Sequence, residues 1–120
     1  MEWMLDKNRP ICPQICEQIC VRIARDEWKP HEKLLSVREV AQTAGVNPNT
    51  VQKAFKMLEE KGLIYSEPSS GWFVGENREE AVRAADELIG QKITGFFAEL
   101  RQLGLNEEQI KDYIGRVQNG

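Results

Sequence analysis

Apolar residues recur every four positions near the start of the chain, which is the spacing of one face of an α-helix. The members of this stripe are Ile11, Ile15, Ile19 and Ile23. They predict a helix that begins near Pro10, a residue suited to a first helical turn, and runs to about Glu27. Ahead of it, Trp3 and Leu5 alternate with Glu2, Met4 and Asp6. This alternation predicts a short strand with one buried face.

Two shorter helices are predicted next, each with clear start and stop signals. Ser36 and Glu39 have the spacing of a capping box, in which each side chain binds the other residue's backbone amide. The first helix stops at Gly45, and Asn47-Pro48 then starts a second helix that ends at Gly62. Their predicted inward residues are Val37, Val40, Ala41 and Ala44, then Val51, Ala54, Phe55 and Leu58. Two such helices across a glycine-containing turn predict a helix-turn-helix.

Two strand-like segments follow, Leu63–Glu67 and Trp72–Val74, and the turn Pro68–Gly71 joins them into a hairpin. A helix-turn-helix followed directly by a hairpin is the element order of a winged helix. The predicted fold is therefore mainly α with a small antiparallel β wing, followed by a two-helix C-terminal part. The segment Trp3–Leu5 is expected to add a third strand to the wing.

Gly75 and Asn77 mark a boundary, so we expect a winged-helix domain over residues 1–75 and a short helical dimerisation part over residues 76–120. In the second part apolar residues follow steps of three and four, as in a coiled-coil seam. The expected dimerisation residues on this seam are Val82, Ala85, Ile89, Ile93, Phe96 and Leu100. Gly104 can end this helix, and Asn106 with Gln109 has the spacing of a second capping box.

The last helix carries Ile110, Ile114 and Val117 on one face, which we expect to point inward. Two helices of this kind cannot close a core of their own, so a second copy of the chain is the expected cover. The other interpretation of the seam is a pocket in which Phe96 and Phe97 surround an apolar effector. Because so short a segment cannot enclose a cavity, such an effector would lie between subunits. Its identity is not readable from the sequence.

Composition places the chain among globular proteins, since 41% of its 120 residues are hydrophobic and 29% are charged. The formal net charge of −3 argues against binding nucleic acid by bulk charge alone. Residues 1–75 carry ten basic and ten acidic side chains, whereas residues 76–120 carry six and nine, so the acid excess lies in the second part. No apolar run has the length of a membrane span and no signal peptide is recognisable, so we expect a cytoplasmic protein that does not contact the membrane.

The helix that starts at Asn47 is the strongest candidate for a functional surface. Its outward residues are Asn49, Thr50, Gln52, Lys53 and Lys56. Asn and Gln can form paired hydrogen bonds with adenine, Thr can contact the thymine methyl group, and Lys can reach guanine or phosphate. In the preceding helix Arg38 opposes the helix dipole, which a phosphate or guanine contact explains better than stability does. This pattern predicts a helix that reads double-stranded DNA; the alternatives are an ordinary solvated face and an Arg38 paired with Glu39.

Several segments also match a known family. They are Pro10-Ile11 with Gln14-Ile15, Leu34–Ala41, Gly45–Val51, Leu58–Ile64, and Gly71 with Phe73-Val74. Over residues 3–75 the chain resembles the GntR family of bacterial transcription regulators, and most of all its YtrA subfamily. The resemblance implies a homodimer on a palindromic operator, usually acting as a repressor and often controlling transporter genes. It also implies that DNA is approached by Arg38, Asn47, Asn49, Thr50, Gln52 and Gly71.

The predicted wing departs from the family pattern, because residues 67–72 contain one acid and no base where other members carry Arg or Lys. We therefore expect it to meet phosphate through backbone amides and serine hydroxyls, with Ser70 and Gly71 at its tip. Leu35 stands where many members have Pro, a change that should only loosen the entry to the helix.

Three cysteines, Cys12, Cys16 and Cys20, share one stripe of the first helix. Three aligned thiolates would suit a thiol-responsive or soft-metal-responsive regulator. However, the first and third are about 12 Å apart along a helix axis and cannot share one ion, so we expect all three to fill the edge of the core. The sequence thus predicts no metal site, no cofactor and no catalytic residue. A winged-helix module that binds proteins rather than specific DNA is the remaining alternative.

Overall fold

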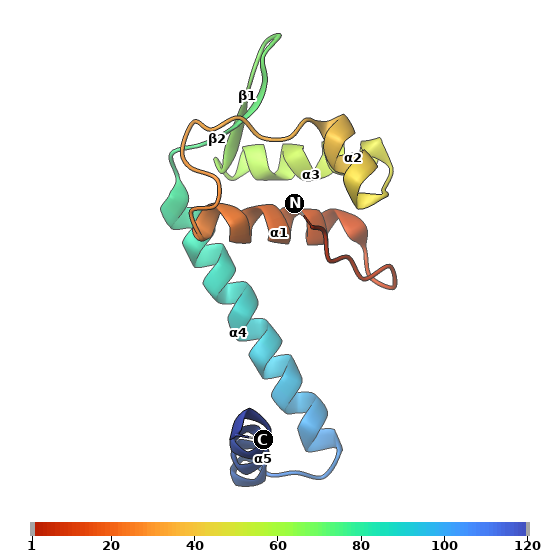
Figure 1. The fold of residues 1–120 in the computed structure, drawn as a ribbon, viewed down its shortest axis with the longest axis vertical. Helices are drawn as coiled ribbons and strands as arrows, with labels where there is room; N and C mark the ends of the chain where they lie inside the picture. Colours follow the sequence, from red (N-terminus) through yellow and green to blue (C-terminus); the bar gives the residue numbers. More distant parts are fainter. Residues whose placement is uncertain (1, 120) are drawn as a thin grey trace. The chain divides into compact units, whose positions relative to one another are not determined.

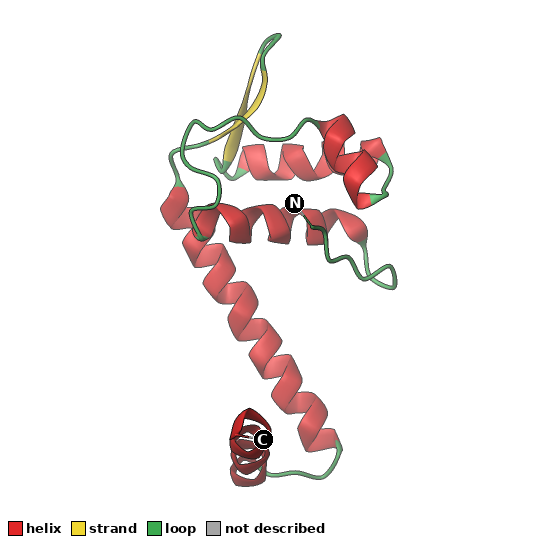
Figure 2. Ribbon diagram, viewed as in Figure 1, coloured by secondary structure: helices red, strands yellow, loops and turns green. Residues whose placement is uncertain are grey.

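A computed structural model describes residues 2–119, which contain five helices and one two-stranded antiparallel sheet (Figures 1 and 2). The elements are α1 (Ile11–Ala24), α2 (Val37–Ala44), α3 (Pro48–Glu60), β1 (Ile64–Glu67), β2 (Gly71–Val74), α4 (Arg78–Gln102) and α5 (Glu107–Asn119). The predicted fold class is confirmed. The chain forms two compact units, Met1–Ala85 and Asp86–Gly120. The first turns of α4 therefore belong to the winged helix, beyond the boundary expected at residue 75.

The core of the first unit is built mainly by α1 and α3. Of the predicted inward residues of these helices, Ile11 is half-buried at the start of α1 and the rest are buried: Ile15, Ile19, Ile23, Val51, Ala54, Phe55 and Leu58. The ring of Phe55 meets Trp72 edge to face, with 5.4 Å between ring centroids, so the core continues under β2. Ala81 and Ala85 of α4 are also buried. Burial of this kind is the main favourable term in folding, so this unit has a core of its own.

The start and stop signals of α2 and α3 act as predicted. The Ser36 hydroxyl accepts from the Glu39 amide and the Glu39 carboxylate accepts from the Ser36 amide, both at 3.0 Å. Gly45 and Gly62 follow the two helices with φ of 69° and 74°, a left-handed conformation that glycine adopts without steric cost. Helix α1 ends at Ala24, before the predicted Glu27.

The prediction of a third wing strand at Trp3–Leu5 is wrong. That segment lies against helices. The Gln18 side chain accepts a hydrogen bond from the Met4 amide and donates one to the Met4 carbonyl, and the Trp3 indole donates to the Thr43 hydroxyl at 3.1 Å. Residues 32–34 pair with the hairpin instead. The Leu34 amide donates to the backbone carbonyl of Trp72, and the Val74 amide donates to the backbone carbonyl of Glu32, both at 2.9 Å.

The second unit pairs the C-terminal part of α4 with α5. Asn106 and Gln109 form the predicted second capping box at 2.8 and 2.9 Å. Ile110 is fully buried, but Val117, expected inward, is 78% exposed. Two helices leave one side of the apolar stripe without a partner, which is the physical reason for this difference. Among residues 2–119 no helix is both long and apolar enough to cross a membrane.

Candidate nucleic-acid interface

The turn between α2 and α3 fixes the start of the predicted reading helix. The Asn47 side-chain oxygen accepts the amide of Asn49 at 2.8 Å, and Pro48 fills the first helical position. This oxygen already accepts one hydrogen bond, so Asn47 has less capacity for the paired contact that amides form with adenine, which uses both its oxygen and its nitrogen. Asn49 and Gln52 keep both groups for a ligand.

The outer face of α3 is polar and free of internal partners. Gln52, Lys53 and Lys56 are exposed, Thr50 is half-buried, and the opposite face of the helix lies in the core. Within residues 2–119, the side chains of Gln52, Lys53 and Lys56 form no hydrogen bond or ion pair. The face therefore offers amides and ammonium groups that the fold itself does not use.

Arg38 on α2 is likewise exposed. The alternative pairing with Glu39 does not occur, because that carboxylate binds the Ser36 amide, and this backbone bond and the Ser36 hydroxyl hold the Glu39 pKa below its ordinary value. No other acid takes its place in the part of the chain that the structure describes. Arg38 is thus a cation with no internal counter-ion.

Arginines elsewhere in the first unit are paired, which makes this face distinct. Arg9 pairs with Asp6 at 3.5 Å, and Arg22 and Arg25 both pair with Glu27, at 3.1 and 3.7 Å. Acids in this unit therefore neutralise bases away from α2 and α3. The equal numbers of acidic and basic residues in residues 1–75 conceal a face with a local positive charge.

The structure supplies the wing with a base that sequence reasoning missed. Lys33 forms a bridge with Phe73 of β2, and a Cβ built on Gly71 would lie 3.5 Å from the Lys33 Cε atom. The Lys33 side chain thus extends toward the wing tip. The only sequence signal was the extended segment before Ser36, because pairing between distant segments is not visible in local patterns.

The wing tip itself is a tight turn. Ser69 has a φ of 65° and Gly71 a φ of 112°, and the Ser70 amide donates to the Glu67 carbonyl at 3.1 Å. The Ser70 amide is therefore already bonded, and Ser70 offers its hydroxyl. Glu67, the one acid of the wing, is exposed.

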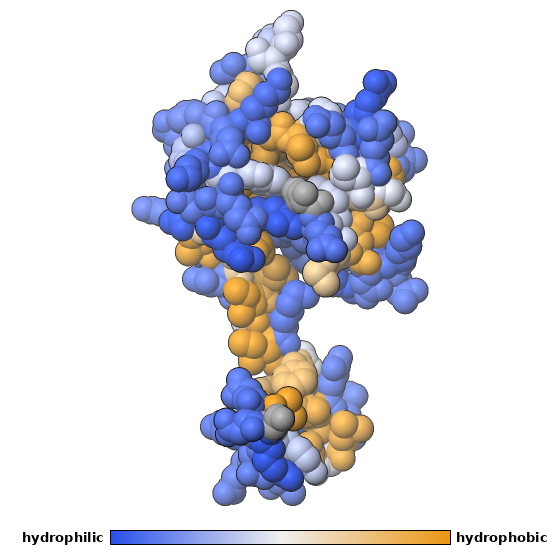
Figure 3. Space-filling view, viewed as in Figure 1, coloured by the Kyte–Doolittle hydropathy of each residue, from blue (hydrophilic) through white to orange (hydrophobic). Residues whose placement is uncertain are grey.

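The residues predicted for dimerisation divide between the two units. Ala85 is buried in the first unit and has no surface to offer to another chain, and Val82 is half-buried there. In the second unit Ile89, Ile93 and Phe96 are 52%, 54% and 47% exposed. Hydrophobic side chains reach the surface of this unit in the space-filling view (Figure 3).

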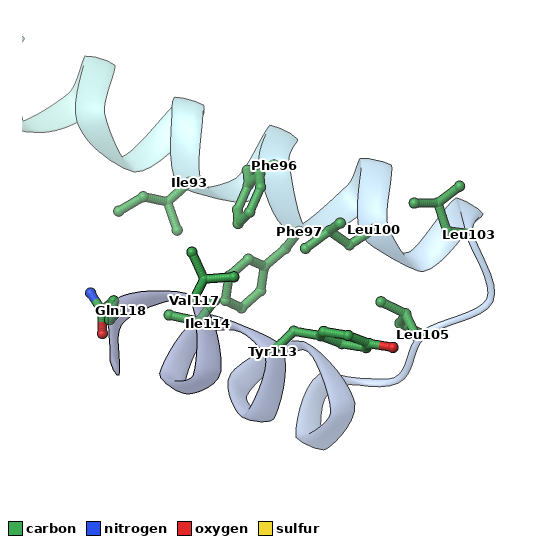
Figure 4. Close-up of a pocket in the computed structure, with 10 residues that line it drawn as sticks. All are labelled: Ile93, Phe96, Phe97, Leu100, Leu103, Leu105, Tyr113, Ile114, Val117 and Gln118. Carbon is green, nitrogen blue, oxygen red and sulfur yellow. The ribbon is translucent and has the colours of Figure 1, made fainter. Parts of the chain in front are cut away.

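Part of this apolar surface forms a groove of about 950 Å³ between the end of α4 and α5. Side chains from both helices and from the loop between them line it (Figure 4). They are Ile93, Phe96, Phe97, Leu100, Leu103, Leu105, Tyr113, Ile114, Val117 and Gln118. The lining is apolar apart from Tyr113 and Gln118, so the groove fits another apolar surface and offers little to a charged ligand.

Comparison with known proteins identifies the family. Residues 13–74 match the family described as bacterial regulatory proteins, gntR family. The chain belongs to the GntR family. It is 34% identical to the HTH-type transcriptional repressor YtrA of Bacillus subtilis, over 92% of this chain and 85% of that protein.

Two solved structures extend the likeness. A GntR family transcriptional regulator from Listeria monocytogenes has a TM-score of 0.76 and 32% identity, over 93% of this chain and 98% of that one. The DNA-binding domain of AraR, solved in complex with operator ORE1, has a TM-score of 0.54 and 30% identity, over 62% and 94% of the two chains. The GntR-family chain described above is therefore a winged-helix, DNA-binding transcription regulator and not an enzyme.

Proposed function

We propose that this GntR-family chain acts in the cytoplasm as a homodimeric repressor that binds a palindromic operator. The observation that carries the proposal is the face formed by Arg38 and the outer residues of α3, whose charged and amide groups have no partner in the described part of the chain. An unpaired positive face with free amides has the composition of a surface that reads DNA.

We assign different roles to the residues of this face. Arg38, Lys53 and, from the wing, Lys33 contact phosphate and position the protein without reading sequence. Asn49 and Gln52 contact base edges in the major groove, since each retains a free oxygen and amide. Thr50 and Asn47 border this contact, and the Ser70 hydroxyl and Gly71 at the wing tip approach the neighbouring backbone.

The apolar surface of the second unit supports the dimerisation in this proposal. Ile89, Ile93 and Phe96 are each about half exposed, and Leu100 lines the adjoining groove. A second copy of the chain presents the same apolar surface, and such self-complementary contacts are the commonest way in which soluble proteins dimerise. Two reading helices in one dimer would fit half-sites about 34 Å apart on the duplex.

The direction of regulation rests on similarity. YtrA of Bacillus subtilis is named a repressor, and the resemblance to its subfamily implies control of transporter genes. We include repression of a transporter operon in the proposal. No effector is assigned.

The test is selection of bound duplexes from a random pool, followed by affinity measurements with Arg38→Ala and Gln52→Ala. We expect a palindromic sequence. Arg38→Ala should weaken binding to all sequences, and Gln52→Ala should relax the preference at one position, each by about 1–3 kcal/mol. Arg25→Ala is the matched control, because that exposed arginine pairs with Glu27 away from this face.

Equal losses for the two variants on every sequence would contradict the division of roles. Recovery of no preferred sequence at physiological salt would favour the protein-interaction module over an operator-binding regulator.

A further inference from the structure

One cluster of side chains lies outside the proposed DNA-binding face, where α1 packs against α3. The Sγ atom of Cys12 is 3.5 Å from the Sδ atom of Met57, and the Cys16 thiol donates to the Ala54 carbonyl at 3.4 Å. All three sulfur-bearing residues are half-buried, and both cysteines are free thiols. Sequence periodicity could not find this cluster, because Met57 comes from a different helix.

The two thiols also interact with each other. Burial, together with the charge and hydrogen bonding of the neighbouring Cys12, raises the pKa of the Cys16 thiol to about 12. At neutral pH the Cys16 thiol is therefore protonated, and an ion that binds its sulfur has to displace that proton. What remains is three sulfur donors, from two helices, held side by side and partly shielded from water.

We propose that Cys12, Cys16 and Met57 form a binding site for a soft monovalent metal ion of the Cu(I) class. Thiolate and thioether ligands select such ions. The separation of 3.5 Å between Cys12 Sγ and Met57 Sδ is below about 4.6 Å, twice a metal–thiolate bond of about 2.3 Å, so one ion can reach both atoms. Cys16 follows Cys12 by one helical turn, which places its side chain on the same face.

The binding step balances without a redox partner. Cu(I) forms bonds to two cysteine sulfurs, each thiol releases its proton to solvent, and the thioether of Met57 donates a lone pair. The resulting unit carries one negative charge. Lys61 is close enough for its charge to act on Cys16, where it lowers the thiol pKa, and it would offset that negative charge.

The same residues disfavour harder or four-coordinate metals. Zinc takes four N, O or S donors in structural sites. Among the residues that the structure describes, no group of three or more His, Cys, Asp or Glu side chains could hold a metal. The third donor at this site is a neutral thioether, which suits Cu(I) and not zinc.

The test is anaerobic titration with Cu(I), using a colorimetric Cu(I) chelator as competitor and the ultraviolet absorption of Cu(I)–thiolate bonds as the readout. The whole chain should bind one equivalent. Cys12→Ser and Cys16→Ser should each lose this binding. Met57→Leu keeps the side-chain volume and should weaken it at least tenfold. Cys20→Ser is the matched control, because this third cysteine should leave the affinity unchanged.

The inference is overturned if Cys20→Ser weakens binding as much as Cys16→Ser, or if Met57→Leu binds as the wild type does. Either result would mean that Cu(I) binds a thiol pair without the site described. Thermal unfolding of each metal-free variant identifies any that fails to fold, and Met57→Leu still tests the site if a serine variant does not fold. None of these readouts involves DNA, so they are independent of the proposed operator binding.

Discussion

The two units of the chain treat their apolar residues in opposite ways. In the first unit Ile15, Ile19 and Ile23 of α1 and the inner face of α3 are buried within one chain. In the second unit the seam of α4 and part of α5 remain at the surface, with Leu103 and Val117 more than three-quarters exposed. The first unit thus has a core of its own, whereas the second leaves an apolar surface exposed to solvent.

This contrast explains why one sequence can carry a neutral reading domain and an acidic second part. The reading domain needs its few free cations on one face, and its remaining arginines pair with acids. The second unit needs an apolar face and can surround it with solvated charge, as in the pairs Lys111–Glu107 at 3.4 Å and Arg116–Asp112 at 2.9 Å. Under the proposed function, specific affinity comes from base contacts and paired half-sites rather than from bulk charge.

The largest expected effect is on the core of the first unit. Phe55→Ala removes a ring that is 1% exposed and meets Trp72, and it should lower the free energy of unfolding by about 3–5 kcal/mol. Phe96→Ala, its counterpart in the second unit, should cost far less in chemical denaturation at concentrations where the chain is monomeric. Similar losses for the two variants would mean that the units do not differ in this way.

The next effect concerns association. Phe96→Glu should convert the dimer to a monomer in sedimentation equilibrium, and it should weaken binding to a two-half-site operator by about 10²–10⁴-fold because avidity is lost. Gln91→Glu adds the same charge at an exposed polar position of α4 and is the control. A dimer that survives Phe96→Glu would place the interface elsewhere.

Helix capping gives a smaller effect that should also separate the units. Ser36→Ala should destabilise the first unit by about 1 kcal/mol, within a range of about 0.5–2. Asn106→Ala breaks the corresponding capping box before α5. This variant should weaken the affinity between the two chains of the dimer more than it shifts the main unfolding transition. Denaturant unfolding and sedimentation of both variants would measure this.

The smallest effect is a dependence on pH. Hydrogen bonds from Ser36 lower the pKa of Glu39, so its contribution to stability is present above the unfolded-state pKa and is lost as the pH falls through the lower folded-state pKa. Glu39→Gln should remove this part of the acid dependence. Urea unfolding at several pH values below neutrality gives the free energy of unfolding of the wild type and of Glu39→Gln. If Glu39 contributed nothing, the two would depend on pH in the same way.

Local signals predicted most of the fold. The capping box at Ser36, the left-handed glycines and the apolar faces of α1 and α3 all depend on residues within a few positions of each other. The strand expected at Trp3–Leu5 was wrong because Gln18, in a helix, satisfies that backbone. A two-residue alternation could not reveal a partner so far along the chain.

The candidate interface shows the same limit. The outer residues of α3 follow from helical periodicity, and the structure shows all of them exposed except Thr50, which is half-buried. Lys33 reaches the wing only because residues 32–34 pair with β2, and Met57 meets Cys12 only because α1 packs against α3. Both features depend on contacts between segments far apart in the chain, which cannot be predicted from local patterns in a single sequence.

The most direct test of the central claim compares operators with one and with two half-sites, using the whole chain at physiological salt. We expect two chains on the two-half-site duplex, measured by sedimentation, and an affinity at least a hundredfold tighter than for the single half-site. Equal affinity for the two duplexes, with one chain bound to each, would contradict that claim.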